Sequence, residues 1–299
     1  MSTPTITFVG IGLMGAPMAR RLLGQGFQLR AWNRTFAKAA VLSSLGAHAE
    51  ADLGEAVRGA DIVVSMLENG AVVSQVIDAA LPALKQGALW IDMSSTRQDE
   101  AVAFNARLEG LGFHFLDAPV SGGVAGAEAG TLAIMAGGSA HDFSTAEAVL
   151  QAMGRPMLVG PAGSGQVAKL CNQLIVGGTL NIIAEALLLA QAAGADPAAV
   201  RAAIRGGFAE SRILEVHGQR MLDRNFLPGG QVKSQLKDLQ NVLAAAADAG
   251  VVLPVTALVT EHYQSIAGEV PRADQSAALL AVEKLNPGQR LGAGPDQLP

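Results

Sequence analysis

The sequence predicts an α/β protein whose first half is a doubly wound, mainly parallel sheet and whose second half is entirely helical. Short apolar runs alternate with amphipathic segments through the first half. A glycine-rich motif directly follows the first of these runs, and strand-like runs stop after Gly160, where Ala-rich helical periodicity begins. The chain has 299 residues, enough for two domains, and we expect these to cover residues 1–161 and 162–299.

The first half contains the apolar runs that we predict to be strands, and amphipathic segments separate them. The predicted strands are residues 5–9, 28–32, 61–66, 88–93, 114–119, 132–136 and 156–159. The predicted helices between them are residues 15–25, 36–44, 71–80, 98–111 and 140–153. Each connection is long enough for the right-handed crossover that parallel strands require.

The second half reads as helices throughout. The predicted helices are residues 165–194, 197–206, 213–222, 232–249, 254–268 and 274–285. The first is long enough to join two domains, and its apolar stretch at 174–195 also has the length of a membrane span. That stretch carries Asn181, Glu185 and Gln191, so we expect a buried helix and no membrane. The tail, residues 286–299, holds three Pro and three Gly, and we expect it to be loosely ordered.

Composition excludes several classes of function. Half of the residues are hydrophobic, and the formal net charge of -5 comes without any block of like charges, so nucleic acid is not an expected partner. Cys171 is the only cysteine, which rules out an internal disulfide and a cysteine-rich metal site. The first seven residues lack signal-peptide features, and we therefore expect a protein of the reducing cytoplasm.

The glycine-rich motif is the first candidate binding site. Its pattern, GxGxxG, follows a predicted strand and precedes a predicted helix, as in Rossmann-type dinucleotide sites. The first glycine would make the tight turn, the second would let the backbone approach a pyrophosphate, and the third would let helix and strand pack closely. The alternative is an ordinary strand-to-helix turn. The loop consists of Gly10, Ile11, Gly12, Leu13, Met14 and Gly15.

The end of the second predicted strand bears on cofactor choice. An acidic residue there would bind the ribose 2′-hydroxyl of NAD, but the sequence has Asn33, Arg34 and Thr35. An arginine at this position favours the 2′-phosphate of NADP, although NAD stays possible. The alternative is that Arg34 is a solvated surface residue.

Four segments together resemble the β-hydroxyacid dehydrogenase family, which includes 3-hydroxyisobutyrate dehydrogenase and tartronate semialdehyde reductase. The segments are FVGIGLMGAPMA at 8–19, DAPVSGG at 117–123, GSGQVAKLCN at 163–172 and KDL at 237–239. They occur in the family's order, and the resemblance extends from Ile6 to about Leu285. Residues 203–226 look closest to the tartronate semialdehyde and glyoxylate reductase branch.

The resemblance implies that Lys169 is the general acid, and the base in the reverse direction. Reduction of an aldehyde needs a proton donor at the carbonyl oxygen while hydride reaches the carbon. Lys169 and Asn172 are three residues apart in a predicted helix, so both project from one face. The alternative is a lysine on the surface of an amphipathic helix.

Two further parts of the resemblance concern the substrate. Ser121, Gly122 and Gly123 follow a predicted strand at its carboxyl end, where open α/β sheets bind ligands. A hydroxyl and exposed N–H groups there would hold the substrate carboxylate, whereas the alternative is a plain glycine-rich turn. The resemblance assigns Asn172 to the substrate's hydroxyl or carboxylate, and the alternative is an amide that caps or bridges within the core.

The remaining assignments concern the cofactor. The resemblance places Met66 and Leu67 in a loop that lines it, Ser95 at its nicotinamide end, and Lys237 as a ligand from the second domain. Lys237 has no acid four residues away on either side, which favours a ligand role over a surface ion pair. Glu68 stands where the family has proline or a small residue, and its carboxylate must point to water if the cofactor lies nearby.

The sequence therefore predicts an NADP-dependent reductase or dehydrogenase of a small 3-hydroxy acid or its aldehyde, of the tartronate semialdehyde, glyoxylate or 3-hydroxyisobutyrate class. No metal is expected. An imine reductase is one alternative, but such enzymes generally lack a lysine at the position of Lys169. A non-catalytic NADP-binding scaffold is the other. The resemblance also implies a homodimer or homotetramer, which would help to bury the apolar helix.

Overall fold

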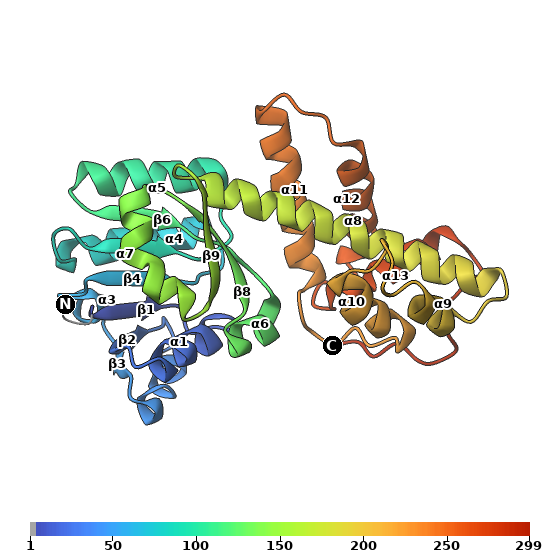
Figure 1. Cartoon of the computed structure of the whole chain (residues 1–299), viewed down its shortest axis with the longest axis horizontal. Helices are drawn as coiled ribbons and strands as arrows, with labels where there is room; N and C mark the ends of the chain where they lie inside the picture. The colour runs from blue at the N-terminus through green and yellow to red at the C-terminus, as the bar shows by residue number, and fades with distance from the viewer. Residues whose placement is uncertain (1–3) are drawn as a thin grey trace. The chain divides into compact units, whose positions relative to one another are not determined.

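The computed structural model describes residues 4–299, and the chain divides into two compact units, Met1–Lys169 and Leu170–Pro299 (Figure 1). The division falls inside the long helix α8 (Ser164–Ala192), a little after the boundary that we placed at residue 161. Residues 1–3 begin the segment without signal-peptide features and lie outside the described range.

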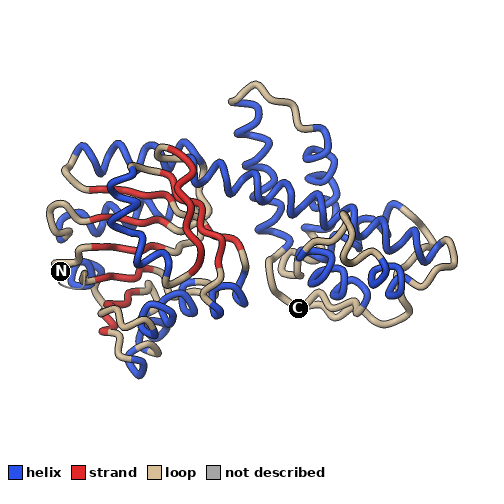
Figure 2. The backbone as a smooth tube through the Cα atoms, in the orientation of Figure 1, coloured by secondary structure: helices blue, strands red, loops and turns tan. Residues whose placement is uncertain are grey.

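The first unit is built on a nine-stranded sheet with the order β3-β2-β1-β4-β5-β6-β8-β7, and β9 pairs with β8 (Figures 1 and 2). The strands are β1 (Ile6–Val9), β2 (Leu29–Trp32), β3 (His48–Glu50), β4 (Ile62–Ser65), β5 (Leu89–Asp92), β6 (His114–Asp117), β7 (Val120–Ser121), β8 (Leu132–Gly137) and β9 (Gly154–Gly160). Strands β1 to β6 pair in parallel, whereas β8 runs antiparallel to β6 and β7. The prediction of a parallel sheet is thus correct for the first six strands, and beyond them the observed sheet is mixed.

Helices cover both faces of this sheet. They are α1 (Gly15–Gly24), α2 (Phe36–Ala40), α3 (Leu53–Val57), α4 (Gly70–Ala80), α5 (Gln98–Gly110), α6 (Gly123–Ala129) and α7 (Ala140–Gln151), with short 3₁₀ turns η1 (Ser43–Leu45) and η2 (Leu81–Ala83). Alternation along β1 sends Phe8 into a core with Leu22 of α1, and Val9 into a separate core with Ile77 of α4. The sheet is therefore doubly wound, as predicted.

Two pairs of elements were missed in the sequence. One pair, β3 and α3, fills the connection between residues 44 and 61, which is long for a plain loop and was a usable signal. The Asp52 side chain starts α3 by accepting a hydrogen bond from the N–H of Glu55 at 2.9 Å. The other pair is β7 and α6, and α6 lies between two glycines with positive φ, namely Gly122 at 137° and Gly130 at 69°.

The second unit is helical, as predicted. After α8 it comprises α9 (Pro197–Ala203), α10 (Arg212–Leu222), α11 (Val232–Asp248), α12 (Pro254–Ala267) and α13 (Ala278–Leu285), with the 3₁₀ turn η3 (Gln275–Ala277). Helices α9 and α12 begin with a proline at their first position. Helix α10 begins with a side-chain cap, because Ser211 Oγ accepts a hydrogen bond from Leu214 N at 3.0 Å.

Helix α8 is long and apolar enough to cross a membrane by length and composition alone. Two polar residues of its apolar stretch, Asn181 and Gln191, nevertheless have partners in the second unit. Asn181 is buried, its Nδ2 donates to Gly177 O at 2.9 Å, and its Oδ1 lies 2.9 Å from His262 Nδ1. The buried face of α8 supplies apolar side chains such as Leu180 and Leu187 to the core of the second unit. These contacts support the interpretation of α8 as a core helix.

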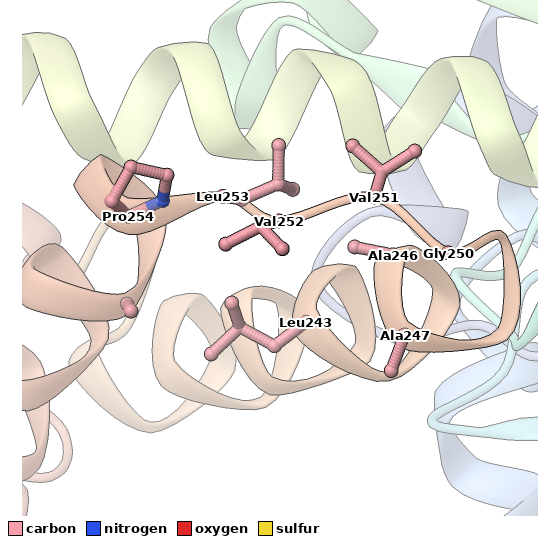
Figure 3. A pocket seen from close by; sticks show the side chains of 9 residues that line it. Leu243, Ala246, Ala247, Gly250, Val251, Val252, Leu253 and Pro254 are labelled. Atoms are coloured by element: carbon pink, nitrogen blue, oxygen red, sulfur yellow. The ribbon is translucent and has the colours of Figure 1, made fainter.

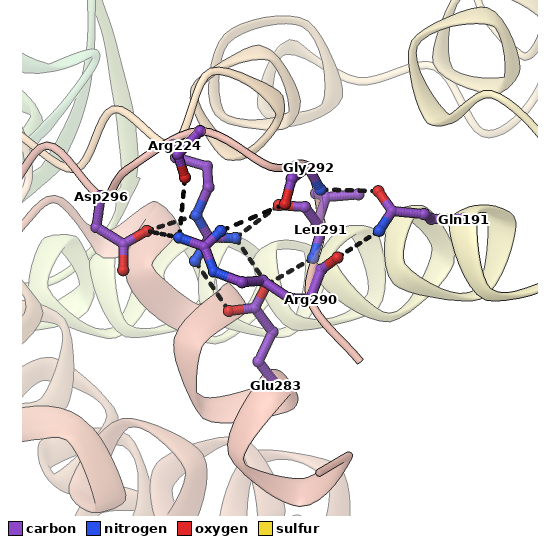
Figure 4. A network of polar contacts seen from close by, with 8 residues as sticks. Gln191, Arg224, Glu283, Arg290, Leu291, Gly292 and Asp296 are labelled. Carbon is purple, nitrogen blue, oxygen red and sulfur yellow. Dashed lines mark hydrogen bonds and ion pairs between the residues drawn. The ribbon is translucent and has the colours of Figure 1, made fainter. Parts of the chain in front are cut away.

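The C-terminal tail is ordered, so our expectation for residues 286–299 was wrong. Leu291 is buried, and the backbone of Gln297 pairs at 2.9 Å with both Phe226 N and Arg224 O. Figure 4 shows the buried guanidinium of Arg224 bonded to Glu283 and to Asp296 of the tail. Proline and glycine content suggested disorder, but the tail is fixed by one apolar anchor and one carboxylate that composition does not reveal.

Replacing Arg224 should destabilise the second unit. Arg224→Met leaves Glu283 and Asp296 without their common partner, and breaking a buried ion pair in this way costs about 3 kcal/mol of unfolding free energy. Chemical denaturation measures this loss. The control is Arg212→Met, whose exposed pair with Glu215 should be worth less than about 1 kcal/mol. Equal losses in the two variants would contradict the tail-anchoring role.

A carboxylate is buried at the carboxyl end of β5. Asp92 has no exposed surface, and its Oδ1 accepts hydrogen bonds from Ser65 Oγ at 2.8 Å and Ser94 Oγ at 2.6 Å. Its Oδ2 has no hydrogen-bond partner among the described residues. Burial raises the pKa of Asp92 to about 7, although the two serine hydroxyls oppose the shift.

This shift predicts a pH dependence of stability. Because the pKa of Asp92 is higher in the folded than in the unfolded state, its contribution is complete below about pH 4 and is lost as pH rises through about 7. Asp92→Asn does not titrate, so its stability relative to the wild type should improve from pH 5 to about pH 7, by on the order of 1 kcal/mol per pH unit, and should then level off.

Denaturation at several pH values tests this prediction, with Asp99→Asn as the control. The exposed Asp99 bonds to Arg97, and this bond lowers the pKa of Asp99. Asp99 therefore affects stability only at acid pH, and the difference in unfolding free energy between Asp99→Asn and the wild type should stay constant from pH 5 to pH 8. A flat difference for Asp92→Asn as well would show that Asp92 ionises normally.

Candidate active site

The three glycines of the loop after β1 have different surroundings. Gly10 has a φ of 100°, and a Cβ there would lie 2.3 Å from Met66 O. A Cβ at Gly15 would lie 1.9 Å from Gly10 O, so both positions exclude a side chain. Gly12 is exposed and nothing lies within 4 Å of its Cβ position. Gly10 and Gly15 thus close the turn, and Gly12 leaves the backbone open to a ligand, as a dinucleotide site requires.

The start of α1 is also suited to an anion. Met14 precedes the helix without a side-chain cap, and the first turn contains no acidic residue. The unsatisfied N–H groups and the positive end of the helix dipole therefore meet no competing carboxylate from the helix itself. This agrees with the pyrophosphate site expected at this position.

Asn33 fixes the glycine loop to the end of β2. Its Oδ1 accepts a hydrogen bond from Ile11 N at 3.0 Å, and its Nδ2 donates to Thr35 O at 3.0 Å. Sequence reasoning assigned Asn33 only to the cofactor and missed this structural role. Arg34 is exposed, and no described residue forms an ion pair with its guanidinium, so the charge is accessible to a ligand.

The loops after β4 and β5 are tied together beneath the surface. Met66 N donates to Val9 O at 2.9 Å, and Leu67 N donates to Ser94 Oγ at 2.8 Å. Ser94 Oγ donates in turn to the buried Asp92, so the carboxylate holds both loops through one hydroxyl. The next residue, Glu68, is exposed, as its charge requires.

A second buried carboxylate fixes the start of α8. Asp117 ends β6, and it accepts hydrogen bonds from Gly163 N at 2.7 Å and from Gln166 N at 2.9 Å. Burial raises the pKa of Asp117 to about 6, while these N–H bonds favour the ionised form. A Cβ at Gly165 would lie 2.6 Å from Asp117 O, so glycine lets the helix begin directly against the strand.

Lys169 follows within the next helical turn and meets the SGG segment. Its Nζ donates to Val120 O at 2.9 Å, and Val120 immediately precedes Ser121. Ser121 is half-buried at the end of β7, whereas Gly122 and Gly123 are exposed and have φ values of 137° and 62°. The structure therefore brings together the predicted proton donor and the predicted carboxylate-binding turn.

Ser95 is held in place by a residue that sequence reasoning did not assign. Gln166 is buried, its Nε2 donates to Ser94 O at 2.9 Å, and its Oε1 accepts from Thr96 N at 3.1 Å. Both neighbours of Ser95 are thus bonded to one amide. The available signal was the place of Gln166 inside the segment 163–172, but no local pattern reveals a contact with residues about seventy positions earlier.

Asn172 and Lys237 both belong to the second unit. Asn172 Nδ2 donates to Gln173 Oε1 at 2.8 Å, and Gln173 Nε2 donates to Asp238 Oδ2 at 2.7 Å. Lys237 Nζ lies 3.2 Å from Asp238 Oδ1. The acidic neighbour of Lys237 is therefore adjacent in sequence, a partner that our reasoning from helical spacing overlooked.

An open apolar pocket lies elsewhere in the second unit, between the end of α11 and the start of α12 (Figure 3). Its volume is about 430 Å³. The residues that line it are Leu243, Ala246, Ala247, Gly250, Val251, Val252, Leu253, Pro254 and Ala257. None of them is a predicted site residue, and none carries a polar side chain to bind an acid.

Known proteins match the chain along nearly its whole length. Residues 5–163 match a family model described as the NAD binding domain of 6-phosphogluconate dehydrogenase, and residues 163–282 match one described as NAD-binding of NADP-dependent 3-hydroxyisobutyrate dehydrogenase. The 2-hydroxy-3-oxopropionate reductase of Escherichia coli (strain K12) is 39% identical over 282 residues, which cover 92% of this chain and 96% of the relative.

Solved structures agree with these matches. Mycobacterium tuberculosis 3-hydroxyisobutyrate dehydrogenase, described with L-serine, has a TM-score of 0.87 at 32% identity, covering 96% of this chain and all of that one. An imine reductase from Pseudomonas sp. has a TM-score of 0.63 over 94% of this chain and all of that one, and at 20% identity this likeness shows the fold alone. The resemblance found in the sequence is confirmed. The chain belongs to the β-hydroxyacid dehydrogenase family and is an NAD(P)-dependent dehydrogenase of the 3-hydroxyacid class.

Proposed function

We propose that this enzyme uses NADPH to reduce a small aldehyde acid, with 2-hydroxy-3-oxopropionate (tartronate semialdehyde) as the first candidate and glyoxylate as the second. Oxidation of a 3-hydroxyisobutyrate-type acid is the same chemistry in reverse. The observation that carries the proposal is the contact of Lys169 Nζ with Val120 O, which puts an ammonium group beside the Ser121–Gly123 turn. The name of the relative from Escherichia coli supports the substrate choice.

The cofactor, when bound, supplies the hydride that goes to the carbonyl carbon. The residues that we assign to it are Gly10, Ile11, Gly12, Leu13, Met14, Gly15, Asn33, Arg34, Thr35, Met66, Leu67, Ser95 and Lys237. The open backbone at Gly12 and the uncapped start of α1 suit its pyrophosphate. The accessible guanidinium of Arg34 suits a 2′-phosphate and supports NADP over NAD.

On the substrate side, we assign the carboxylate to the Ser121 hydroxyl and the N–H groups of Gly122 and Gly123, and assign Asn172 to the substrate as well. An ammonium group has three donors. Lys169 can therefore keep its bond to Val120 O, which orients it, and still donate a proton to the carbonyl oxygen. In the oxidative direction the neutral amine accepts the hydroxyl proton.

The two alternatives are weaker. The likeness to imine reductases is one of fold, and the lysine at position 169 argues against that activity. A non-catalytic NADP-binding scaffold has no need of a lysine held against the SGG turn.

We also propose a homodimer or homotetramer located in the cytoplasm. Helix α8 exposes Ile182 and Leu189, one above the other at a seven-residue interval, with exposed fractions of 61% and 69%. Val252, which lines the apolar pocket, is 87% exposed. Burial of such side chains in a subunit contact would be favourable.

Lys169→Ala should abolish turnover without loss of cofactor binding. Removal of the proton donor should lower kcat by about 10²- to 10⁴-fold, whereas the Kd for NADPH should change by about twofold at most. Stopped-flow kinetics and fluorescence titration measure the two values, and Lys85→Ala, at an exposed ion pair, is the control. Turnover by Lys169→Ala within about tenfold of the wild type would contradict the assignment.

Arg34→Glu should change cofactor preference. Because a charge-assisted hydrogen bond contributes about 1.5 to 3 kcal/mol, kcat/KM for NADPH should fall about 10- to 100-fold more than kcat/KM for NADH. Arg155→Glu changes the same charge at an exposed position of β9 and should leave the preference unaltered. A preference for NADH in the wild type would remove the role of Arg34.

A further inference from the structure

Gln166 connects two segments that the proposed function uses together. Its side chain is 1% exposed, and it carries one donor contact and one acceptor contact, both to the loop after β5. The amide donates to Ser94 O and accepts from Thr96 N, so it bonds to the backbone on either side of Ser95. This pairing fixes the peptide groups that flank the residue assigned to the nicotinamide end of the cofactor.

The other end of Gln166 is fixed as well. Its backbone N–H donates to Asp117 Oδ2 at 2.9 Å, which holds the first turn of α8 to the end of β6. Lys169 is three residues further along the helix, so it projects from the same side, and its Nζ is bonded to Val120 O. One short helical segment thus holds both the Ser95 loop and the proposed proton donor.

The chemistry makes this coupling important. Hydride and proton must reach adjacent atoms of one carbonyl group, and a misplacement of about 1 Å can lower the rate about 10²-fold. A loop that shifts relative to Lys169 would present the cofactor at the wrong distance even if every ligand residue were intact.

We propose that Gln166 is a positioning residue that sets the place of the Ser95 loop relative to the Lys169 ammonium group. This inference rests on the proposed function, in which Ser95 contacts the nicotinamide end and Lys169 moves the proton. In this role Gln166 itself touches neither substrate nor cofactor. It acts through the backbone of residues 94–96.

Gln166→Met tests the proposal, because methionine has a similar length, cannot donate to Ser94 O, and offers Thr96 N only a weak sulfur acceptor. The control is Asn181→Leu, which removes another buried amide of α8, one bonded to Gly177 O and His262. Both variants should lose stability. Only Gln166→Met should lower kcat, by about 10- to 100-fold, with little change in KM for the aldehyde. A purely structural role for Gln166 predicts equal kcat in the two variants at matched stability, and that result would overturn the proposal.

Gln166→Glu provides a rescue. Its protonated carboxyl group has the same donor and acceptor as the amide, whereas the ionised form cannot donate to Ser94 O. The kcat of this variant relative to the wild type should therefore rise as pH is lowered. A ratio that stays constant or falls with decreasing pH contradicts the proposed contact.

Hydrogen exchange gives a readout without turnover. In Gln166→Met the Thr96 N–H loses its amide oxygen acceptor, so peptides that contain residues 94–97 should exchange faster than in the wild type or in Asn181→Leu. Unchanged exchange would show that Gln166 does not hold the loop.

If the wild type turns over and Lys169→Ala does not, full kcat in Gln166→Met overturns this inference alone. If the wild type reduces no aldehyde acid, the proposed function fails, the positioning role fails with it, and exchange reports only whether the amide holds the loop.

Discussion

The site depends on the bonds between the buried carboxylate of Asp117 and the first turn of α8. A helix that carries the lysine we propose as the proton donor must begin at a defined point on the carboxyl edge of the sheet, and two backbone N–H groups bonded to one carboxylate fix that point. The absence of a side chain at Gly165 allows the close approach. Lys169 then reaches Val120 O, beside the turn that we assign to the substrate carboxylate.

A layer of short polar side chains extends this constraint to the cofactor loops. Asp92 and Ser94 join the loops after β4 and β5, and Gln166 joins the second of these to α8. Asn33 links the glycine loop to the end of β2 in the same way. Loops at the carboxyl edge of a parallel sheet are free to vary. An enzyme that needs these loops in defined positions must therefore hold them by contacts from the protein interior. In this protein buried serine, aspartate and amide groups do so.

The sequence predicts what local patterns encode. Strand and helix periodicity placed most elements within a few residues, and the glycine motif located a loop whose geometry suits a dinucleotide.

The predictions failed where long-range contacts decide the structure. The tail is held by Arg224 and Leu291, and composition alone suggested disorder there. Gln166 and Asp92 are polar residues whose roles arise from partners in other loops, and no spacing rule reveals such contacts. The roles assigned to Lys169 and Ser121 came from family resemblance, and the structure adds their proximity.

The most direct test is a crystal structure of the enzyme with NADP⁺ and glycerate, the alcohol formed when 2-hydroxy-3-oxopropionate is reduced. We expect the substrate carboxylate to bind at Ser121–Gly123, with Lys169 Nζ about 3 Å from the hydroxyl oxygen that exchanges the proton. An acid bound elsewhere, with Lys169 directed into solvent, would contradict it.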